Sequence, residues 1–249
     1  TTTLAVNATG GKPATMSGTD VYLADDASAA AYGINNEGTN MGMGNLEFTE
    51  VKAKGGTGSN ATAIASGMYN DTNNSSITAG TINFVNVTAT GGNASTTGNA
   101  DATAYLLQIN NGGNITASGA ITGTSAAVGG YGPTADANAY GFNNTAGTIN
   151  GTNFNLTVSA TGGTGTGAGI ENSENVAEAR GIDNSGTVIM TGGNNNVKVT
   201  ATGGKSSNNA VVSATAYGIN NTGNMTLAGP TTINVEATGG TPDANISGS

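Results

Sequence analysis

Ala216-Tyr217-Gly218-Ile219-Asn220-Asn221 is one copy of a six-residue phrase that recurs along the chain and decides its fold. Further copies occupy residues 31–36, 65–70, 106–111, 139–144 and 179–184. Measured at the third residue of each copy (33, 67, 108, 141, 181 and 218), the period is 33 to 41 residues. Self-similarity at such a period predicts a repeat architecture, in which each unit buries its apolar face against its neighbours.

A second phrase, Val87-Thr88-Ala89-Thr90-Gly91-Gly92 and its copies, ends each repeat. The repeats end near Gly11, Gly56, Gly92, Gly130, Gly163, Gly204 and Gly240. A weaker phrase, such as residues 223–229, lies between the other two. Polar inserts of differing length follow the Gly-Gly pair, which predicts a surface loop at that point of every repeat. We expect a single domain over residues 1–249.

The composition argues against one thick hydrophobic core. Gly occurs 42 times, and charged residues make up 8 % of the chain, against roughly 25 % in ordinary soluble domains. The few large apolar residues suit a thin core that is repeated in every unit. Intrinsic disorder is the alternative, although it usually accompanies a higher charge density than a net −9 over 249 residues.

Apolar and polar residues alternate within each repeat. In residues 233–238, Ile, Val and Ala alternate with Asn, Glu and Thr, as in a strand with one buried and one wet face. In residues 177–180, Ala alternates with Glu178 and Arg180, so the Ala positions are expected to face inward. The Gly that follows is expected to bend the strand and turn the next apolar residue inward as well. Each repeat therefore offers about three short strands.

Stacking one coil per repeat, with parallel strands roughly 4.8 Å apart, would bury a continuous core. The sequence therefore predicts an all-β fold, a parallel β-helix or β-solenoid of about six to seven coils. The alternative is a sandwich or propeller of short antiparallel strands. Propellers usually carry more aromatic residues than the 4 % found in this chain.

The Ala-Tyr-Gly-Ile-Asn-Asn phrase, the Gly-Thr-Ile type of strand and the Ala-Thr-Gly-Gly corner resemble repeats of bacterial autotransporter passengers and filamentous-haemagglutinin-like surface proteins. The resemblance extends from Leu4 to about Gly240. It implies a right-handed parallel β-helix that is secreted and displayed at the cell surface. It transfers no functional residue to this chain.

Several functions are disfavoured by composition. Six Lys and Arg against fifteen Asp and Glu argue against nucleic acid, because phosphate contacts need clustered basic residues. No apolar run approaches the roughly 18 residues of a transmembrane helix. The absence of His and Cys excludes Ser/His and Cys/His nucleophilic catalysis. We expect no enzymatic activity, no catalytic residue and no cofactor.

A β-helix enzyme that cleaves polysaccharides with clustered carboxylates is the second functional hypothesis. Its candidate residues are Asp71, Asp183, Glu171, Glu174 and Glu178, with Arg180. Asp71 and Asp183 are expected about three coils, or roughly 14 Å, apart, too far to act together. A second group of carboxylates precedes the first strand of the repeats: Asp25, Asp26, Asp101 and Asp136. Isolated loop carboxylates lack the six to eight oxygens that calcium needs, so we expect no metal site.

Stacking should align equivalent side chains into rows. Corner asparagines are expected to form an amide ladder that reinforces the stack, comprising Asn36, Asn111, Asn144, Asn184 and Asn221. Outward tyrosines are expected to form a contact stripe, comprising Tyr32, Tyr140 and Tyr217. Outward threonines could form a ladder, comprising Thr88, Thr90, Thr161, Thr200, Thr202 and Thr238. An ice-binding solenoid that uses this ladder is the third functional hypothesis.

The chain opens and closes on the last strand of a repeat, and no polar cap is evident. We expect either a piece of a longer repeat protein or a subunit whose ends stack head to tail into a fibre. The leading hypothesis is an extracellular structural or adhesive solenoid of a bacterial surface. Its partners would be further copies of itself, or glycans or proteins of a host or neighbouring cell.

Overall fold

The computed structural model describes residues 1–11, 26–38, 40–72, 75–94, 98–165, 174–206 and 211–242. These residues form 25 strands and no helix. The strands belong to four parallel sheets, which we name sheets A to D. The predicted parallel β-solenoid is confirmed, and the antiparallel sandwich or propeller is wrong.

Sheet A contains β1 (Thr2–Thr9), β4 (Leu46–Lys54), β8 (Ile82–Thr90), β12 (Ile121–Val128), β16 (Phe154–Thr161), β20 (Asn195–Thr202) and β24 (Thr231–Thr238). Sheet B contains β2 (Ala29–Asn36), β6 (Ala63–Asn70), β10 (Ala102–Ile109), β14 (Ala137–Asn144), β18 (Glu174–Asn184) and β22 (Val211–Asn221). Sheet C contains β3 (Asn40–Gly42), β7 (Ser76–Ala79), β11 (Asn114–Ala117), β15 (Thr148–Gly151), β19 (Thr187–Met190) and β23 (Asn224–Leu227). Sheet D contains β5 (Thr57–Gly58), β9 (Asn93–Ala94), β13 (Tyr131–Gly132), β17 (Thr164–Gly165), β21 (Lys205–Ser206) and β25 (Thr241–Pro242).

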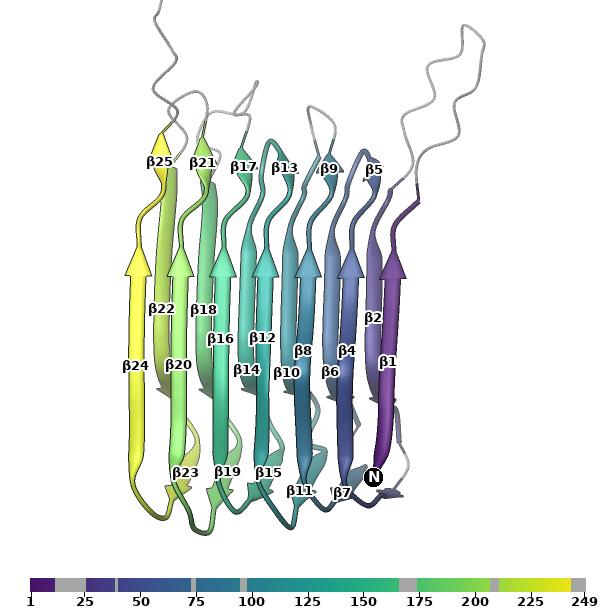
Figure 1. The fold of residues 1–249 in the computed structure, drawn as a ribbon, viewed down its shortest axis with the longest axis vertical. Coiled ribbons are helices and arrows are strands. Elements are labelled where there is room, and N and C mark those ends of the chain that lie inside the picture. Colours follow the sequence, from purple (N-terminus) through teal and green to yellow (C-terminus); the bar gives the residue numbers. More distant parts are fainter. Residues whose placement is uncertain are drawn as a thin grey trace, which may run out of the picture.

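The chain visits sheets B, C, A and D in turn and then returns to sheet B one strand further along. The long strands of sheets A and B lie face to face and run in opposite directions, while the short strands of sheets C and D close the two ends of the flattened coil (Figure 1). The six strands in each of sheets B, C and D are separated by five turns of the chain. The right-handed sense and the count of six to seven coils stay predictions.

The repeated phrases pair with one another in register, with one correction. In sheet B, Leu107 pairs with Met68 on one side and Phe142 on the other. The predicted alignment, which placed Ile109 at this position, was therefore wrong by two residues. The error arose because the third copy of the phrase lacks its Gly, the landmark by which the other copies are aligned.

The strands of sheet D were not predicted. Each comprises two residues directly after the Gly-Gly pair, where only a loop was expected. A two-residue strand is too short to show an alternating pattern, so its pairing with the neighbouring coil leaves no signal in the sequence.

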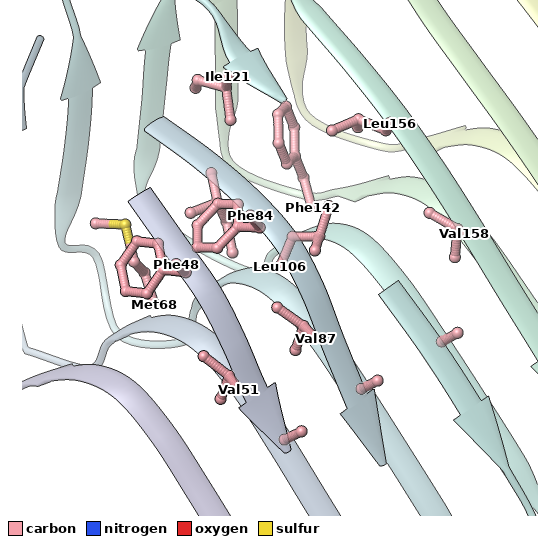
Figure 2. Close-up of a cluster of buried hydrophobic side chains, with 14 of the residues drawn as sticks. Phe48, Val51, Met68, Phe84, Val87, Leu106, Ile121, Phe142, Leu156 and Val158 are labelled. Atoms are coloured by element: carbon pink, nitrogen blue, oxygen red, sulfur yellow. The ribbon is translucent and has the colours of Figure 1, made fainter. Parts of the chain in front are cut away.

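The core is one continuous cluster of buried side chains between sheets A and B, and sheet C contributes residues such as Ile77 to it (Figure 2). Phe48 and Phe84 stack with ring centroids 4.6 Å apart. The Gly of the first phrase lies opposite such large residues: a Cβ on Gly67 would lie 2.4 Å from the Phe84 ring. None of these phrase glycines is among those with positive φ, so close approach of the opposite sheet, rather than backbone strain, requires them. The next apolar residue, such as the fully buried Ile182, does turn inward as predicted.

In one coil, the large and the small core residue have exchanged places between sheets A and B. In sheet A, Gly123 stands where the adjacent strands carry Phe84 and Leu156. In sheet B of the same coil, Leu106 occupies the position that is Gly67 and Gly141 in the adjacent strands. A Cβ on Gly123 would lie 3.0 Å from Leu106 Cδ1, so the Leu fills the space that the missing side chain leaves. The total core volume is thereby kept.

Candidate functional site

The asparagine ladder lies at the corner between sheets B and C. Asn144 Nδ2 donates to Asn184 Oδ1 at 2.8 Å, and Asn184 Nδ2 donates to Asn221 Oδ1 at 2.7 Å. The same amide of Asn184 also donates to the carbonyls of Gly186 and Asn224. Each amide therefore ties its own corner to that of the next coil, and Asn144 and Asn184 are almost wholly buried.

The ladder differs from the prediction at two positions. Asn36 donates to Asn70, which was not predicted. Asn111 is not a member, because it lies outside the strands, is exposed, and donates to Asp71 Oδ1. The ladder position in that coil is occupied by the buried Ile109, which pairs with Asn70 and Asn144. The register error of two residues caused the misplacement of Asn111, whereas Asn70 was aligned correctly with Asn36 and was not named as a ladder member.

Replacing Asn184 by Ala is expected to lower the free energy of unfolding by about 2–3 kcal/mol. The buried Asn144 would lose its acceptor, and the Asn221 side chain and the carbonyls of Gly186 and Asn224 would lose a donor. The matched control is Asn111→Ala, which should change it by no more than about 0.5 kcal/mol. Urea unfolding followed by circular dichroism measures both. Equal losses from the two variants would contradict the placement of Asn111 outside the ladder.

The carboxylates considered for calcium accept hydrogen bonds at the corner between sheets D and B. Asp101 Oδ1 accepts the Asp136 backbone N–H at 3.0 Å, and Asp136 Oδ1 accepts that of Val176 at 2.7 Å. Asp26 accepts from Ser59 and Asn60 in the next coil, whereas Asp25 lies outside the described residues. Within the described ranges, no three His, Cys, Asp or Glu residues lie together as metal ligands would. These carboxylates link neighbouring coils.

Burial raises the pKa of Asp101, and hydrogen bonds from Asp136 and Thr134 oppose the shift. The folded protein therefore holds this proton more tightly than the unfolded chain does, and the contribution of Asp101 to stability falls as pH rises from the ordinary Asp pKa through the raised one. Asp101→Asn keeps an oxygen acceptor and removes the charge. We expect the variant to gain stability relative to the native chain at pH 7 and to gain nothing at pH 3, measured by thermal unfolding. A loss at pH 7 that is absent at pH 3 would contradict the sign.

The outward tyrosine row lies on sheet B. Tyr105 and Tyr140 stack with centroids 4.9 Å apart, and burial together with the neighbouring Tyr140 raises the pKa of Tyr105 to about 12. Tyr105 was missed because of the register error. Arg180 continues the row, with its guanidinium 5.1 Å from the Tyr217 ring centroid.

Ring faces inside the row are already in contact with neighbours. Arg180 also pairs with Glu178 and, at 2.6 Å, with Asp183, so its charge is neutralised locally. Within this row, the most accessible rings are those of Tyr32 and Tyr217, which are 37 % and 43 % exposed. The middle of the row thus reinforces the stack, and the predicted contact stripe retains accessible rings at its two ends.

The candidate enzyme residues that the structure describes form hydrogen bonds and ion pairs with neighbouring side chains. Asp71 accepts from Asn111, and Asp183 pairs with Arg180 and accepts from Asn220. Glu171 lies outside the described residues, and the Glu174 side chain is not described. Of the candidates, the structure brings together Glu178, Arg180 and Asp183, whose charges are engaged in ion pairs with one another.

The predicted threonines lie on the outer face of sheet A in two rows. One row contains Asn7, Lys52, Thr88, Ala126, Ser159, Thr200 and Glu236. The other contains Thr9, Lys54, Thr90, Val128, Thr161, Thr202 and Thr238. Thr161, Thr202 and Thr238 border an open groove of ≈ 530 Å³ whose floor is formed by the Gly-Gly pairs. Ala126 and Val128 interrupt the rows, so the ice-binding hypothesis gains no support from them.

The C-terminal end of the stack presents apolar side chains to solvent. Ile233 and Val235 of β24 are 43 % and 48 % exposed, whereas their counterparts one strand earlier, Val197 and Val199, are buried. In the described part of the chain, β24 pairs with β20 alone. β24 is therefore a strand edge with exposed core residues, a kind of surface that favours pairing with another chain.

The fold and these surfaces define the protein as a parallel β-solenoid. No protein-family model matches the chain, and neither a curated protein nor a solved structure shows significant similarity to it. Among the described residues, no helix is long and apolar enough to cross a membrane.

Proposed function

We propose that the chain is an extracellular structural and adhesive solenoid of a bacterial surface, and that its rods associate end to end into fibres. The observation that carries the proposal is the open end at β24. Ile233 and Val235 are core residues by position in the repeat, yet nearly half of each is exposed to solvent. A second rod that covers this end would remove the apolar surface from water.

The remaining surface supports a structural role. Coils are joined by backbone ladders, asparagine amides and carboxylate-to-backbone bonds. The resemblance of the repeats to autotransporter passengers supports the extracellular part of the proposal. For adhesion, the accessible rings of Tyr32 and Tyr217 are suited to stacking on sugars of a surface glycan.

Electron microscopy of the purified chain at neutral pH tests the proposal. We expect filaments whose width matches one solenoid. Val235→Asp is the matched variant, since a charge at the open end should prevent stacking while circular dichroism retains the native strand signal. Dispersed short rods of the native chain would contradict end-to-end assembly, and a glycan array comparing the native chain with Tyr217→Ala would then test adhesion alone.

A further inference from the structure

We infer that sheet A is continued at the open end by a second copy of this chain, whose β1 adds to the free edge of β24 in parallel, with Val6 opposite Val235. The inference rests on the proposed assembly and names its contact. Both strands are edges of sheet A at opposite ends of the stack: β1 pairs with β4 and β24 with β20 in the described structure. Sheet A is parallel throughout, so a translated copy presents β1 in the correct direction.

The register follows from the shared sequence pattern. Leu4, Val6 and Ala8 of β1 repeat the spacing of Ile233, Val235 and Ala237 of β24. Within the chain, this phrase already pairs with itself, as where Val199 lies opposite Val235 and Ala201 opposite Ala237. The proposed junction reproduces that intramolecular pairing between two molecules.

The side chains on both faces of the junction are compatible. Leu4, Val6 and Ala8 are partly buried against the core of their own molecule, and they would extend the core row over Ile233 and Val235. On the outer face, Glu236 would lie beside Asn7 of the second copy, with Lys52 one strand further. No like charges meet in this row.

The unequal strand numbers fix the axial repeat. Among the described residues, sheet A has seven strands and sheets B, C and D have six, so a junction through sheet A leaves a one-strand gap between the described strands of the other sheets. Seven strands spaced about 4.8 Å apart give an axial repeat of about 34 Å. A junction in which β22 pairs with β2 of the second copy would require β1 and β24 to occupy one place. If one of these two strands were displaced, the axial repeat would be six strand spacings, or about 29 Å.

Cross-linking tests the register, because the chain contains no Cys. Asn7→Cys and Glu236→Cys in one chain place thiols on adjacent strands of the proposed junction, within reach of a short bismaleimide. The control chain carries Asn7→Cys and Asn155→Cys, whose second thiol is exposed in the middle of sheet A. We expect a ladder of covalent oligomers from the first chain and no such ladder from the control chain. Cryo-electron microscopy of the filaments should show an axial repeat near 34 Å.

The outcomes separate the inference from the proposed function. Filaments with a repeat near 29 Å and no covalent ladder would overturn the junction through sheet A and leave end-to-end assembly intact. Neither filaments nor a ladder would overturn both. A ladder of short oligomers without filaments would support the junction and contradict the fibre.

Discussion

Replacing Gly91 by Ala is expected to lower the free energy of unfolding by about 3 kcal/mol or more, because the added methyl meets backbone that has no room to move. A Cβ on Gly91 would lie 1.9 Å from the carbonyl oxygen of Ala100 and 2.6 Å from the backbone nitrogen of Gly130. Those two atoms form a hydrogen bond of 2.8 Å that joins the corner to sheet B. The substitution therefore breaks this bond as well as the packing. Urea unfolding followed by far-ultraviolet circular dichroism measures the loss.

Gly192→Ala is the matched control for Gly91→Ala. Gly192 also lies in a turn, but a Cβ there would have no heavy atom within 4 Å. We expect the control to range from no change to a gain of about 1 kcal/mol, since Ala restricts the unfolded chain. If both variants were equally stable, the Gly-Gly corner would tolerate a side chain and the close approach would not be its reason.

The exchanged pair Leu106 and Gly123 is expected to show strong energetic coupling. Leu106→Gly should lower the free energy of unfolding by about 3–5 kcal/mol, because the residue is fully buried and the cavity cannot be filled by Gly123. Gly123→Leu should lower it by about 1–3 kcal/mol through overpacking against Leu106 and Phe84. The double variant restores the arrangement of the adjacent coils, so its loss should be smaller than the sum of the two single losses by about 2 kcal/mol.

A double-mutant cycle in urea tests this coupling. Its control cycle pairs Leu106→Gly with Val85→Ala, since Val85 is 41 % exposed and no compensation is expected there. Strictly additive losses in the first cycle would mean that Leu106 does not fill the space above Gly123. The coil that carries Leu106 and Gly123 would then have no compensating contact.

The repeated phrases by themselves determined the parallel solenoid and most of the asparagine ladder. Alternation in residues such as 233–238 defines an inward and an outward face, and recurrence of the same phrase requires equivalent residues of successive coils to lie in rows. Asn144, Asn184 and Asn221 were therefore predicted correctly. These features depend on local spacing, which the chain displays directly.

Contacts between neighbouring coils and between opposite sheets were decided by the tertiary structure. The register of Leu107 and the stacking of Tyr105 on Tyr140 depend on which residues lie above and below each strand. The exchange of Leu106 with Gly123 depends on volume shared across the core, which single-strand patterns do not encode. The exposed edge of β24 likewise arises because pairing in a parallel sheet needs a neighbour on each side, and the described structure supplies one on a single side.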